Sequence, residues 1–423
     1  MFSDEDSVSV GDTEVLIIGG GVIGVCCAYY LALAGRRVLL LERGEICSGC
    51  SYGNAGWIVP SHCIPLAAPG VLAKALKWMW NPESPFYLKP RLDWQLFKWL
   101  LGFAAACNPR KVKSAMPLLR DLTRASMKLY AELATRLGLE FGYRQTGSLM
   151  LFDTQNGLEQ GQHDSEALAE VGIRSSVLTA DEVRTREPGV VPKIAGGVYY
   201  HEDAYIDPAE FVRGLAKRAE DHGAKILTGT KATGFRLQDD RIAEVKTSAG
   251  NFSAATVVLA AGAQSGLFAQ MLQINLPIQP GKGYSFRLAS RHFRPLLPLL
   301  LSESKIAITP MGEKVRFSGT LELTGQDTRI NQRRVNAILS NTARYLSIRC
   351  QLPQEQWSGL RPCTPDGLPV ISRSSTLKNL VVATGHAMIG ISLGPITGKL
   401  VAQLVCKEVP QIELSQLSLS RFA

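Results

Sequence analysis

The feature that most constrains the fold lies near the N-terminus, where the apolar segment Val15–Ile18 runs directly into a glycine-rich turn at residues 19–24. Four consecutive apolar residues before a turn are typical of a strand buried on both faces of a parallel sheet. A helical pattern then extends to Ala34, and a second apolar segment, Val38–Leu41, ends in Glu42. The order of strand, glycine turn, helix, strand and acidic residue predicts one complete βαβ unit.

The spacing of the glycines gives this unit a chemical meaning. Gly19, Gly21 and Gly24 form the pattern G-x-G-x-x-G, and Glu42 follows eighteen residues after Gly24. Glycines at these positions allow a tight turn and let a diphosphate approach the free N–H groups of the helix N-terminus. Glu42 can accept hydrogen bonds from both ribose hydroxyls. The pattern predicts a dinucleotide site, and the alternative is a glycine turn in an unrelated α/β protein.

Length and charge set the outer bounds. A chain of 423 residues exceeds one ordinary domain, so we expect two. The formal net charge of +9 suits anionic partners such as a diphosphate cofactor, a carboxylate substrate or an acidic membrane surface. Because no recognition module or clustered basic stripe accompanies this charge, we expect no nucleic-acid partner.

Cysteine usage and apolar segments bear on the compartment. The nine cysteines are scattered through the chain, which fits a reduced cytoplasmic protein better than a disulfide framework. Residues 1–13 are acidic and lack the apolar region of a secretory signal. Apolar runs such as residues 99–107 are far shorter than the roughly 20 residues of a spanning helix. We expect a cytoplasmic protein, with peripheral contact at the inner face of the cell membrane left open, and no metal site.

Helix and strand patterns extend along the rest of the chain. Amphipathic stretches predict helices at residues 74–80, 92–103 and 117–137. Asp207, followed by Pro208 and Glu210, marks the start of another helix. Strands are predicted at residues 225–235, 242–247, 256–261, 305–309, 315–318 and 380–384, before a closing helix whose N-terminus is expected near Pro395.

Three further segments distinguish between nucleotide cofactors. They are the loop of small and hydroxyl residues at 47–57, the segment 257–263, and the segment 357–367. At these residues the chain resembles the D-amino-acid oxidase superfamily of FAD-dependent oxidoreductases. It is most similar there to the bacterial D-amino-acid dehydrogenase small subunit, through residues 54–56, 67–70, 282–285 and 385–386. The resemblance spans nearly the whole chain.

The resemblance implies an α/β fold with two parts. The first is a Rossmann-like FAD-binding domain of the glutathione-reductase type, assembled from residues 1–75, 196–265 and 355–423. The second is an α+β substrate-binding domain with a mixed, largely antiparallel sheet, assembled from residues 76–195 and 266–354.

The resemblance also implies a set of cofactor contacts. Ser51 would face the pyrophosphate, the segment 54–59 would line the isoalloxazine, and Gly390 would begin the segment beside the flavin N1–C2=O edge. Gly359 stands where sarcosine oxidase-like relatives carry a covalent cysteine, so non-covalent FAD is expected, although Cys363 is close by. The cofactor-binding residues are Gly19, Gly21, Val22, Ile23, Gly24, Glu42, Arg43, Ser51, Asn54, Ala55, Gly56, Trp57, Ile58, Ala232, Ala260, Ala261, Gly262, Gly390, Ile391 and Ser392.

Three residues are candidates for catalysis. Arg361 can hold a substrate carboxylate through two parallel hydrogen bonds, and its alternative is an ion pair with Asp366. Tyr284 would bring a hydroxyl near the substrate, or would simply pack as a strand residue. His386 lies in a glycine-rich turn and would either tune a proton or play a structural role.

The resemblance implies oxidative deamination of D-amino acids to 2-oxo acids and ammonia, by hydride transfer from Cα to flavin N5. No carboxylate base is expected, because a cationic pocket lowers the pKa of the substrate amine. Electrons would pass to a quinone or another acceptor than O2. The D configuration comes from the resemblance alone.

Several alternatives stay open at this point. The substrate could be a cyclic or secondary amino acid (D-proline, D-hydroxyproline, glycine, sarcosine) or a 2-hydroxy acid. Cys47 and Cys50 form a C-x-x-C motif, so a disulfide reductase is one alternative function. A non-catalytic subunit is a further alternative. The helix at 92–103 is interpreted as a cover over the substrate domain, with a membrane-surface helix as the alternative. The chain could form a homo-oligomer or be one subunit of a hetero-oligomer.

Overall fold

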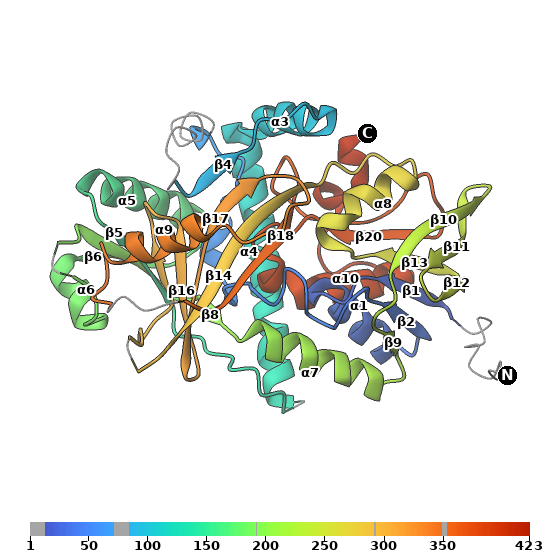
Figure 1. Ribbon diagram of the computed structural model, residues 1–423, viewed down its shortest axis with the longest axis horizontal. Helices are drawn as coiled ribbons and strands as arrows, with labels where there is room; N and C mark the ends of the chain where they lie inside the picture. The colour runs from blue at the N-terminus through green and yellow to red at the C-terminus, as the bar shows by residue number, and fades with distance from the viewer. Residues whose placement is uncertain (1–12, 72–83, 137, 192, 292, 349–352) are drawn as a thin grey trace.

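The computed structural model describes residues 13–71, 84–136, 138–191, 193–291, 293–348 and 353–423. The chain builds two large sheets side by side, one at the right and one at the left of Figure 1, with helices packed around both. The predicted helix at 74–80 lies outside the described residues. The α/β class with a second, mixed sheet is confirmed.

The six-stranded sheet contains the predicted βαβ unit. Its order is β19-β20-β13-β1-β2-β9, parallel except for β19, which runs antiparallel to β20. The strands are β1 (Val15–Ile18), β2 (Val38–Leu41), β9 (Lys225–Leu227), β13 (Thr256–Leu259), β19 (Val370–Arg373) and β20 (Leu380–Thr384). Helix α1 (Val22–Leu33) is apolar around its circumference and is accordingly buried, between α7 (Pro208–Asp221) and α10 (Gly390–Val405).

The strand predicted at 225–235 is two strands. β9 belongs to the parallel sheet, and the chain turns at Gly229, where φ is +63°, before β10 (Ala232–Gln238) begins. β10 forms a small antiparallel sheet with β11 (Arg241–Thr247) and β12 (Gly250–Phe252). A glycine with positive φ allows the reversal that a continuous apolar pattern conceals.

The second sheet has nine strands in the order β18-β14-β17-β16-β15-β5-β7-β6, with β4 paired to β17. The pairs β15–β5 and β17–β4 are parallel and the others are antiparallel. The strands are β4 (Phe86–Leu88), β5 (Ser148–Phe152), β6 (Ser175–Thr179), β7 (Gly196–Tyr200), β14 (Gln279–Ala289), β15 (Leu299–Leu301), β16 (Ile306–Met311), β17 (Lys314–Leu323) and β18 (Gln354–Cys363). Because β7 and β18 hydrogen-bond into this sheet, the boundaries predicted at residues 196 and 355 are wrong for these two strands.

The remaining helices cover the two sheets. Asp207 caps α7 as predicted, its carboxylate accepting from the N–H of Ala209 at 2.9 Å. The others are α3 (Trp94–Ala106), α4 (Pro109–Arg136), α5 (Gln155–Glu170), α6 (Ala180–Arg186), α8 (Ser265–Met271) and α9 (Gln332–Thr342). The predicted start of α4 at Pro117 is wrong, because this proline lies inside the helix. Within the described residues, no helix is both long and apolar enough to cross a membrane.

Helix α10 begins at Gly390, five residues before the predicted start at Pro395. A proline inside a helix removes the N–H that would bond to the carbonyl four residues earlier, here that of Ile391. The fully buried hydroxyl of Tyr130 on α4 donates to that carbonyl at 2.7 Å. This hydrogen bond satisfies a group that Pro395 leaves free, and it joins the substrate side of the molecule to the first turn of α10.

We expect Tyr130→Phe to lower the free energy of unfolding by about 1–2 kcal/mol, because the Ile391 carbonyl would then be buried without a donor. Urea unfolding followed by circular dichroism measures the change. Tyr143→Phe is the matched control, since the Tyr143 ring stacks on Tyr130 and no hydrogen bond to its hydroxyl occurs within the described residues. Equal stability of the two variants would contradict this role.

A buried carboxylate joins three elements near the boundary of the two sheets. Asp203 accepts from the hydroxyls of Ser61 and Ser148, each at 2.6 Å. Ser61 lies in the short 3-10 helix Pro60–His62 that follows β3 (Trp57–Ile58), and Ser148 opens β5. Burial raises the pKa of Asp203 to about 7, although these hydrogen bonds oppose the shift.

This raised pKa predicts a pH dependence of stability. Between the unfolded pKa of about 4 and the folded value near 7, the folded protein binds more protons than the unfolded chain, so stability falls as pH rises through this window. We expect the free energy of unfolding to fall between pH 4 and pH 7 by up to roughly 4 kcal/mol more in the wild type than in Asp203→Asn. Parallel pH profiles for the two proteins would contradict the prediction.

Candidate active site

A cavity of about 420 Å³ lies at the carboxyl ends of β1, β2 and β13, where open α/β sheets bind ligands. Residues from widely separated parts of the chain line it, including Trp357 of β18 and Thr328 of the β17–α9 connection. Predicted cofactor residues that line it are Gly19, Gly21, Val22, Ile23, Glu42, Arg43, Ser51, Asn54, Ala232, Ala260, Ala261, Gly262, Gly390 and Ile391. The other predicted cofactor residues are not among those that line the cavity, namely Gly24, Ala55, Gly56, Trp57, Ile58 and Ser392.

The glycine turn is built for close backbone approach. Gly19 has φ +115°, and a Cβ there would lie 2.5 Å from the carbonyl oxygen of Ala260. A Cβ on Gly24 would lie 1.8 Å from the oxygen of Gly19. Any side chain at either position would force the first turn of α1 away from the sheet. The Ser51 hydroxyl accepts from the N–H of Val22 at 2.9 Å, at the helix N-terminus where the pyrophosphate is expected.

Glu42 stabilises the turn from the end of β2. Its two carboxylate oxygens accept from the N–H groups of Gly20 at 2.6 Å and Gly44 at 2.9 Å. Each oxygen keeps a further lone pair that can accept from a ribose hydroxyl. The geometry therefore fits the predicted contact between Glu42 and a ribose.

Two residues that the sequence did not identify hold the loop after the cysteines against the nine-stranded sheet. Arg316 of β17 is buried, and its guanidinium donates to the carbonyls of Tyr52 at 2.6 Å and Asn54 at 2.7 Å. Thr309 of β16 donates to the carbonyl of Ala55 at 2.8 Å and accepts from the Trp57 indole at 2.7 Å. Burial and then a neighbouring arginine lower the pKa of Arg316 to about 10, so it stays charged at neutral pH. In the sequence, the signal that could have identified Arg316 is an arginine inside an apolar strand.

The Arg361 side chain packs against β14, where Gly283 has no side chain to obstruct it. Its Nη1 donates to the carbonyl of Thr320 at 2.7 Å, and a Cβ on Gly283 would lie 2.1 Å from that nitrogen. Asp366 pairs with Arg421 at 2.7 Å, so the predicted alternative of an Arg361–Asp366 ion pair is wrong. Across the part of the chain that the structure describes, no carboxylate pairs with Arg361. Four of its five N–H donors are left for a ligand.

Tyr284 lies on the other face of β14. Successive strand residues point to opposite faces, and Arg361 packs on the face of Gly283, one residue away. The Tyr284 hydroxyl donates to Glu322 at 2.6 Å, inside the core under α9. The prediction that this hydroxyl contacts the substrate is therefore wrong, and the alternative of a packed strand residue is the one observed.

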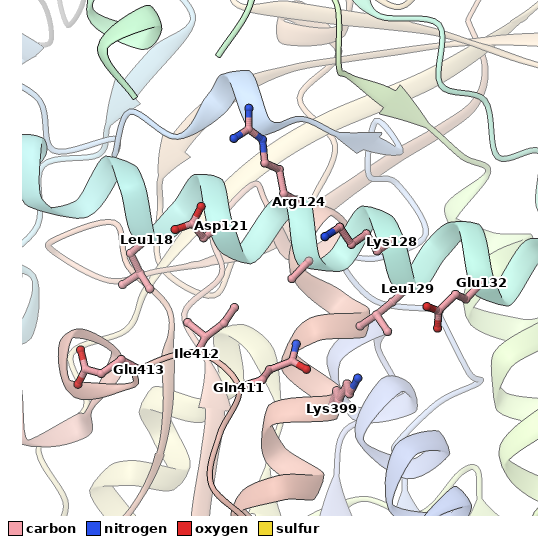
Figure 2. Close-up of a pocket in the computed structure, with 11 residues that line it drawn as sticks. Leu118, Asp121, Arg124, Lys128, Leu129, Glu132, Lys399, Gln411, Ile412 and Glu413 are labelled. Carbon is pink, nitrogen blue, oxygen red and sulfur yellow. The ribbon is translucent and has the colours of Figure 1, made fainter. Parts of the chain in front are cut away.

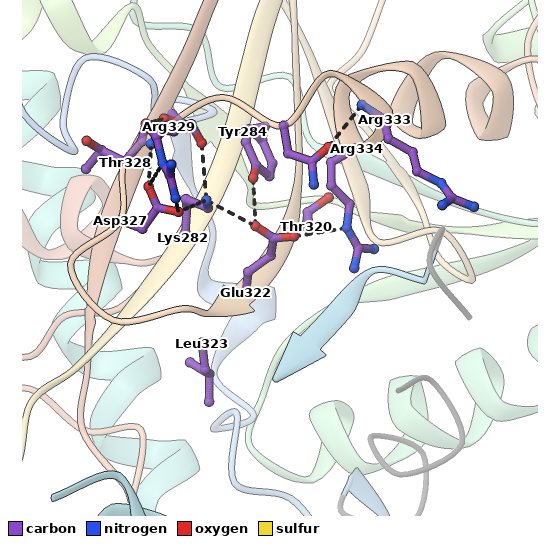
Figure 3. Close-up of polar contacts among 12 residues, drawn as sticks. Lys282, Tyr284, Thr320, Glu322, Leu323, Asp327, Thr328, Arg329, Arg333 and Arg334 are labelled. Carbon is purple, nitrogen blue, oxygen red and sulfur yellow. Dashed lines mark hydrogen bonds and ion pairs between the residues drawn. The ribbon is translucent and has the colours of Figure 1, made fainter. Parts of the chain in front are cut away.

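Figure 3 shows the charged cluster that surrounds this hydroxyl. Glu322 is buried and forms ion pairs with Arg334 of α9 at 2.9 Å and with Lys282 at 3.5 Å. Lys282 also lies 3.7 Å from Asp327, on the segment that carries the cavity residue Thr328. The cluster ties α9 and this segment to the sheet behind Arg361.

His386 lines the cavity and is buried. Its Nε2 lies 3.0 Å from the hydroxyl of Thr397, and Nδ1 has no hydrogen-bond partner among the described residues. Burial lowers the pKa of His386 to about 3, so the imidazole is neutral at physiological pH. An unpartnered buried nitrogen in the cavity wall fits a hydrogen bond to a bound cofactor.

The cysteines of the C-x-x-C are poor candidates for thiol chemistry. Burial raises the pKa of Cys47 to about 12 and also raises that of Cys50. A thiolate is the reactive form, and neither residue forms it readily at neutral pH. The disulfide reductase alternative therefore loses its chemical basis.

In the described parts of the chain, no group of three His, Cys, Asp or Glu side chains is placed to hold a metal ion.

A second hollow, drawn in Figure 2, shares no lining residue with this cavity. It is an open groove of about 720 Å³ between α4, α10 and the segment 411–413. Asp121, Arg124, Lys128, Glu132 and Lys399 give it charges of both signs. None of the predicted site residues lines it, so the cavity at the carboxyl ends of β1, β2 and β13 is the candidate active site.

Comparison with known proteins identifies the family. The model described as FAD dependent oxidoreductase (DAO) matches residues 14–404. A D-amino acid dehydrogenase of Granulibacter bethesdensis is 34% identical over 421 residues, which cover 97% of this chain and 100% of the relative. The solved glycine oxidase of Geobacillus kaustophilus is similar with a TM-score of 0.78 at 25% identity, covering 97% of this chain and 99% of the other.

The L-proline dehydrogenase of P. horikoshii shares the fold, with a TM-score of 0.75 at 21% identity over 97% of this chain and 98% of the other. The glycine turn, Glu42 and the unpartnered nitrogen of His386 fit the dinucleotide cofactor of the family. The chain belongs to the DAO family of FAD-dependent oxidoreductases.

Proposed function

We propose that the protein is a D-amino-acid dehydrogenase that converts D-amino acids to 2-oxo acids and ammonia. The observation that carries the proposal is Arg361, which lies between the cavity-lining residues Leu360 and Pro362 and has one backbone hydrogen bond and no paired carboxylate among the described residues. The 34% identity to a D-amino acid dehydrogenase along the whole length of both chains supports the choice of substrate.

Arg361 binds the substrate carboxylate through two N–H donors and so fixes the orientation of Cα. FAD held at the glycine turn and Glu42 would supply the acceptor for a hydride from the substrate carbon, and water would hydrolyse the resulting imine to the 2-oxo acid and ammonia. The positive charge of Arg361 lowers the pKa of the substrate amine and favours its neutral form. Glu42 is the only acidic residue among the described residues that line the cavity, and it lies at the ribose end. The reaction therefore needs no carboxylate base.

The cofactor is held without a covalent bond in this proposal. A Cβ on Gly359 would lie 1.9 Å from the Trp357 ring, so no side chain fits at the position of the covalent cysteine. Burial raises the pKa of the nearby Cys363 to about 12, which disfavours its thiolate. The electrons pass to a quinone or another acceptor than O2, as the dehydrogenase names of the relatives suggest.

A second candidate function has support from the solved structures. The similarity to a glycine oxidase over nearly the whole chain favours small or secondary amines such as glycine, sarcosine or D-proline. Arg361 would bind the carboxylate of any of these substrates, and the pocket walls would select among them.

Anaerobic reduction of the bound flavin tests the proposal. We expect D-alanine to bleach the absorption band at about 450 nm while L-alanine, D-lactate, glycine and sarcosine do not. Slow recovery of the colour in air, and fast recovery with a quinone, would support the choice of acceptor. Bleaching by glycine or sarcosine in preference to D-alanine would favour the second candidate. A flavoprotein that none of them reduces would overturn both.

Substitutions of Arg361 test how the carboxylate is bound. We expect Arg361→Lys to raise KM for D-alanine by about 10- to 100-fold, because a lysine cannot form the paired hydrogen bonds, and Arg361→Met to cost more. Arg373→Lys is the matched control, since Arg373 also donates to a backbone carbonyl, that of Leu404 at 2.9 Å, but lies on β19. Steady-state kinetics with an artificial acceptor measures the effect, and an unchanged KM in Arg361→Lys would rule out the assignment.

A further inference from the structure

The outward face of α3 is unusually apolar. The side chains of Trp94, Phe97 and Leu101 are 67%, 49% and 56% exposed, and Leu92 just before the helix is fully exposed. The inward face of the same helix, formed by Leu96, Trp99, Phe103 and Ala106, is already buried against Cys363 and Leu323. Burial in the fold therefore explains one face of α3, and among the described residues the other face has no apolar partner.

The apolar face continues onto α8. Gln270 of α8 donates to Gln95 of α3 at 2.9 Å, so the two helices are neighbours, as Figure 1 also shows. On α8 the side chains of Leu267 and Met271 are exposed. We call the whole area the α3–α8 surface, which consists of Leu92, Trp94, Phe97, Leu101, Leu267 and Met271. Large apolar side chains exposed together on two neighbouring helices indicate an interaction site.

Lysine side chains lie within and beside this surface. The Lys98 ammonium lies 5.5 Å from the centre of the Trp94 ring, within the apolar cluster. Lys89 is exposed before α3, and Lys111 is exposed after it, where it bonds to the carbonyl of Ala105. Asp93 caps the helix and pairs with Arg91, so its charge is compensated. The surface thus combines aromatic and aliphatic side chains with lysines that form no ion pair among the described residues.

The surface also borders the active site. Phe268, next to Leu267 on α8, lines the cavity together with Gln264. On the other side, the Trp99 indole donates to the carbonyl of Cys363, two residues after Arg361, at 2.9 Å. A partner bound at the α3–α8 surface would therefore lie close to the cofactor end of the cavity.

We propose that the α3–α8 surface docks the protein on an anionic lipid bilayer, with α3 lying in the plane of the interface. Tryptophan and phenylalanine prefer the interfacial region, and lysines beside them can reach anionic headgroups. A protein partner fits less well, because charged residues such as Lys98 are depleted from the centres of protein interfaces. The inference rests on the proposed function in one respect, namely that a lipid-dissolved quinone would meet the cofactor at this surface.

Vesicle flotation of the FAD-loaded protein tests the docking. We expect flotation with vesicles of phosphatidylcholine and phosphatidylglycerol, and much less with phosphatidylcholine alone or at high salt. The double variant Trp94→Ser/Phe97→Ser should bind at least about tenfold more weakly. Leu296→Ser/Val409→Ser is the matched control, because it removes two exposed apolar side chains elsewhere and should float as the wild type does.

Three results would overturn the docking. They are no flotation of the wild type, equal flotation of the Trp94→Ser/Phe97→Ser variant, or light scattering that finds a wild-type dimer and a monomeric variant, which would assign the surface to a second copy of the chain. Retained FAD and an unchanged circular dichroism spectrum would show that the variant is folded.

Reduction by D-alanine in solution separates this inference from the proposed function. Both the wild type and the Trp94→Ser/Phe97→Ser variant should be bleached equally by the substrate and differ only in the reduction of a quinone held in vesicles. A wild type that floats but is not bleached by D-alanine would leave the docking supported and the proposed function overturned.

Discussion

The structure depends on the close contact between the first turn of α1 and the end of β1. Gly24 lies so near the carbonyl of Gly19 that no side chain fits between them, and a Cβ on Gly19 would lie 2.5 Å from the carbonyl oxygen of Ala260, just after the neighbouring strand β13. This contact brings the N-terminus of a buried helix to the edge of the sheet, with its free N–H groups facing the cavity. The position of every other part of the site is set relative to this turn.

The second sheet and helix α4 complete the site through polar contacts to backbone. Arg316 and Thr309 bind carbonyls of the loop 52–55, and Tyr130 binds the carbonyl of Ile391. Each contact joins residues more than 250 positions apart in the sequence. The cavity wall is therefore held by both sheets, which explains why substrate-binding and cofactor-binding residues come from alternating parts of the chain.

The parts of this account that the sequence predicts are those set by local pattern. The βαβ unit, the Asp207 cap and the glycine turn each follow from residues a few positions apart. Tyr284 was placed on the wrong face because its direction depends on how β14 pairs with β17 and β18. Arg316 was missed because its partners are distant carbonyls, and the start of α10 was misplaced because Tyr130 compensates for Pro395. A single sequence does not show the partners of long-range contacts, although an arginine inside an apolar strand, as at Arg316, indicates that such a partner exists.

The central claim is that Arg361 binds the substrate carboxylate beside the flavin. A crystal structure of the FAD-loaded protein with pyruvate, the 2-oxo acid expected from D-alanine, tests it most directly. The account predicts both carboxylate oxygens within about 3 Å of two Arg361 nitrogens, with the Cα carbon facing the flavin. Pyruvate bound instead by another cation such as Arg287, with Arg361 bonded only to Thr320, would contradict it.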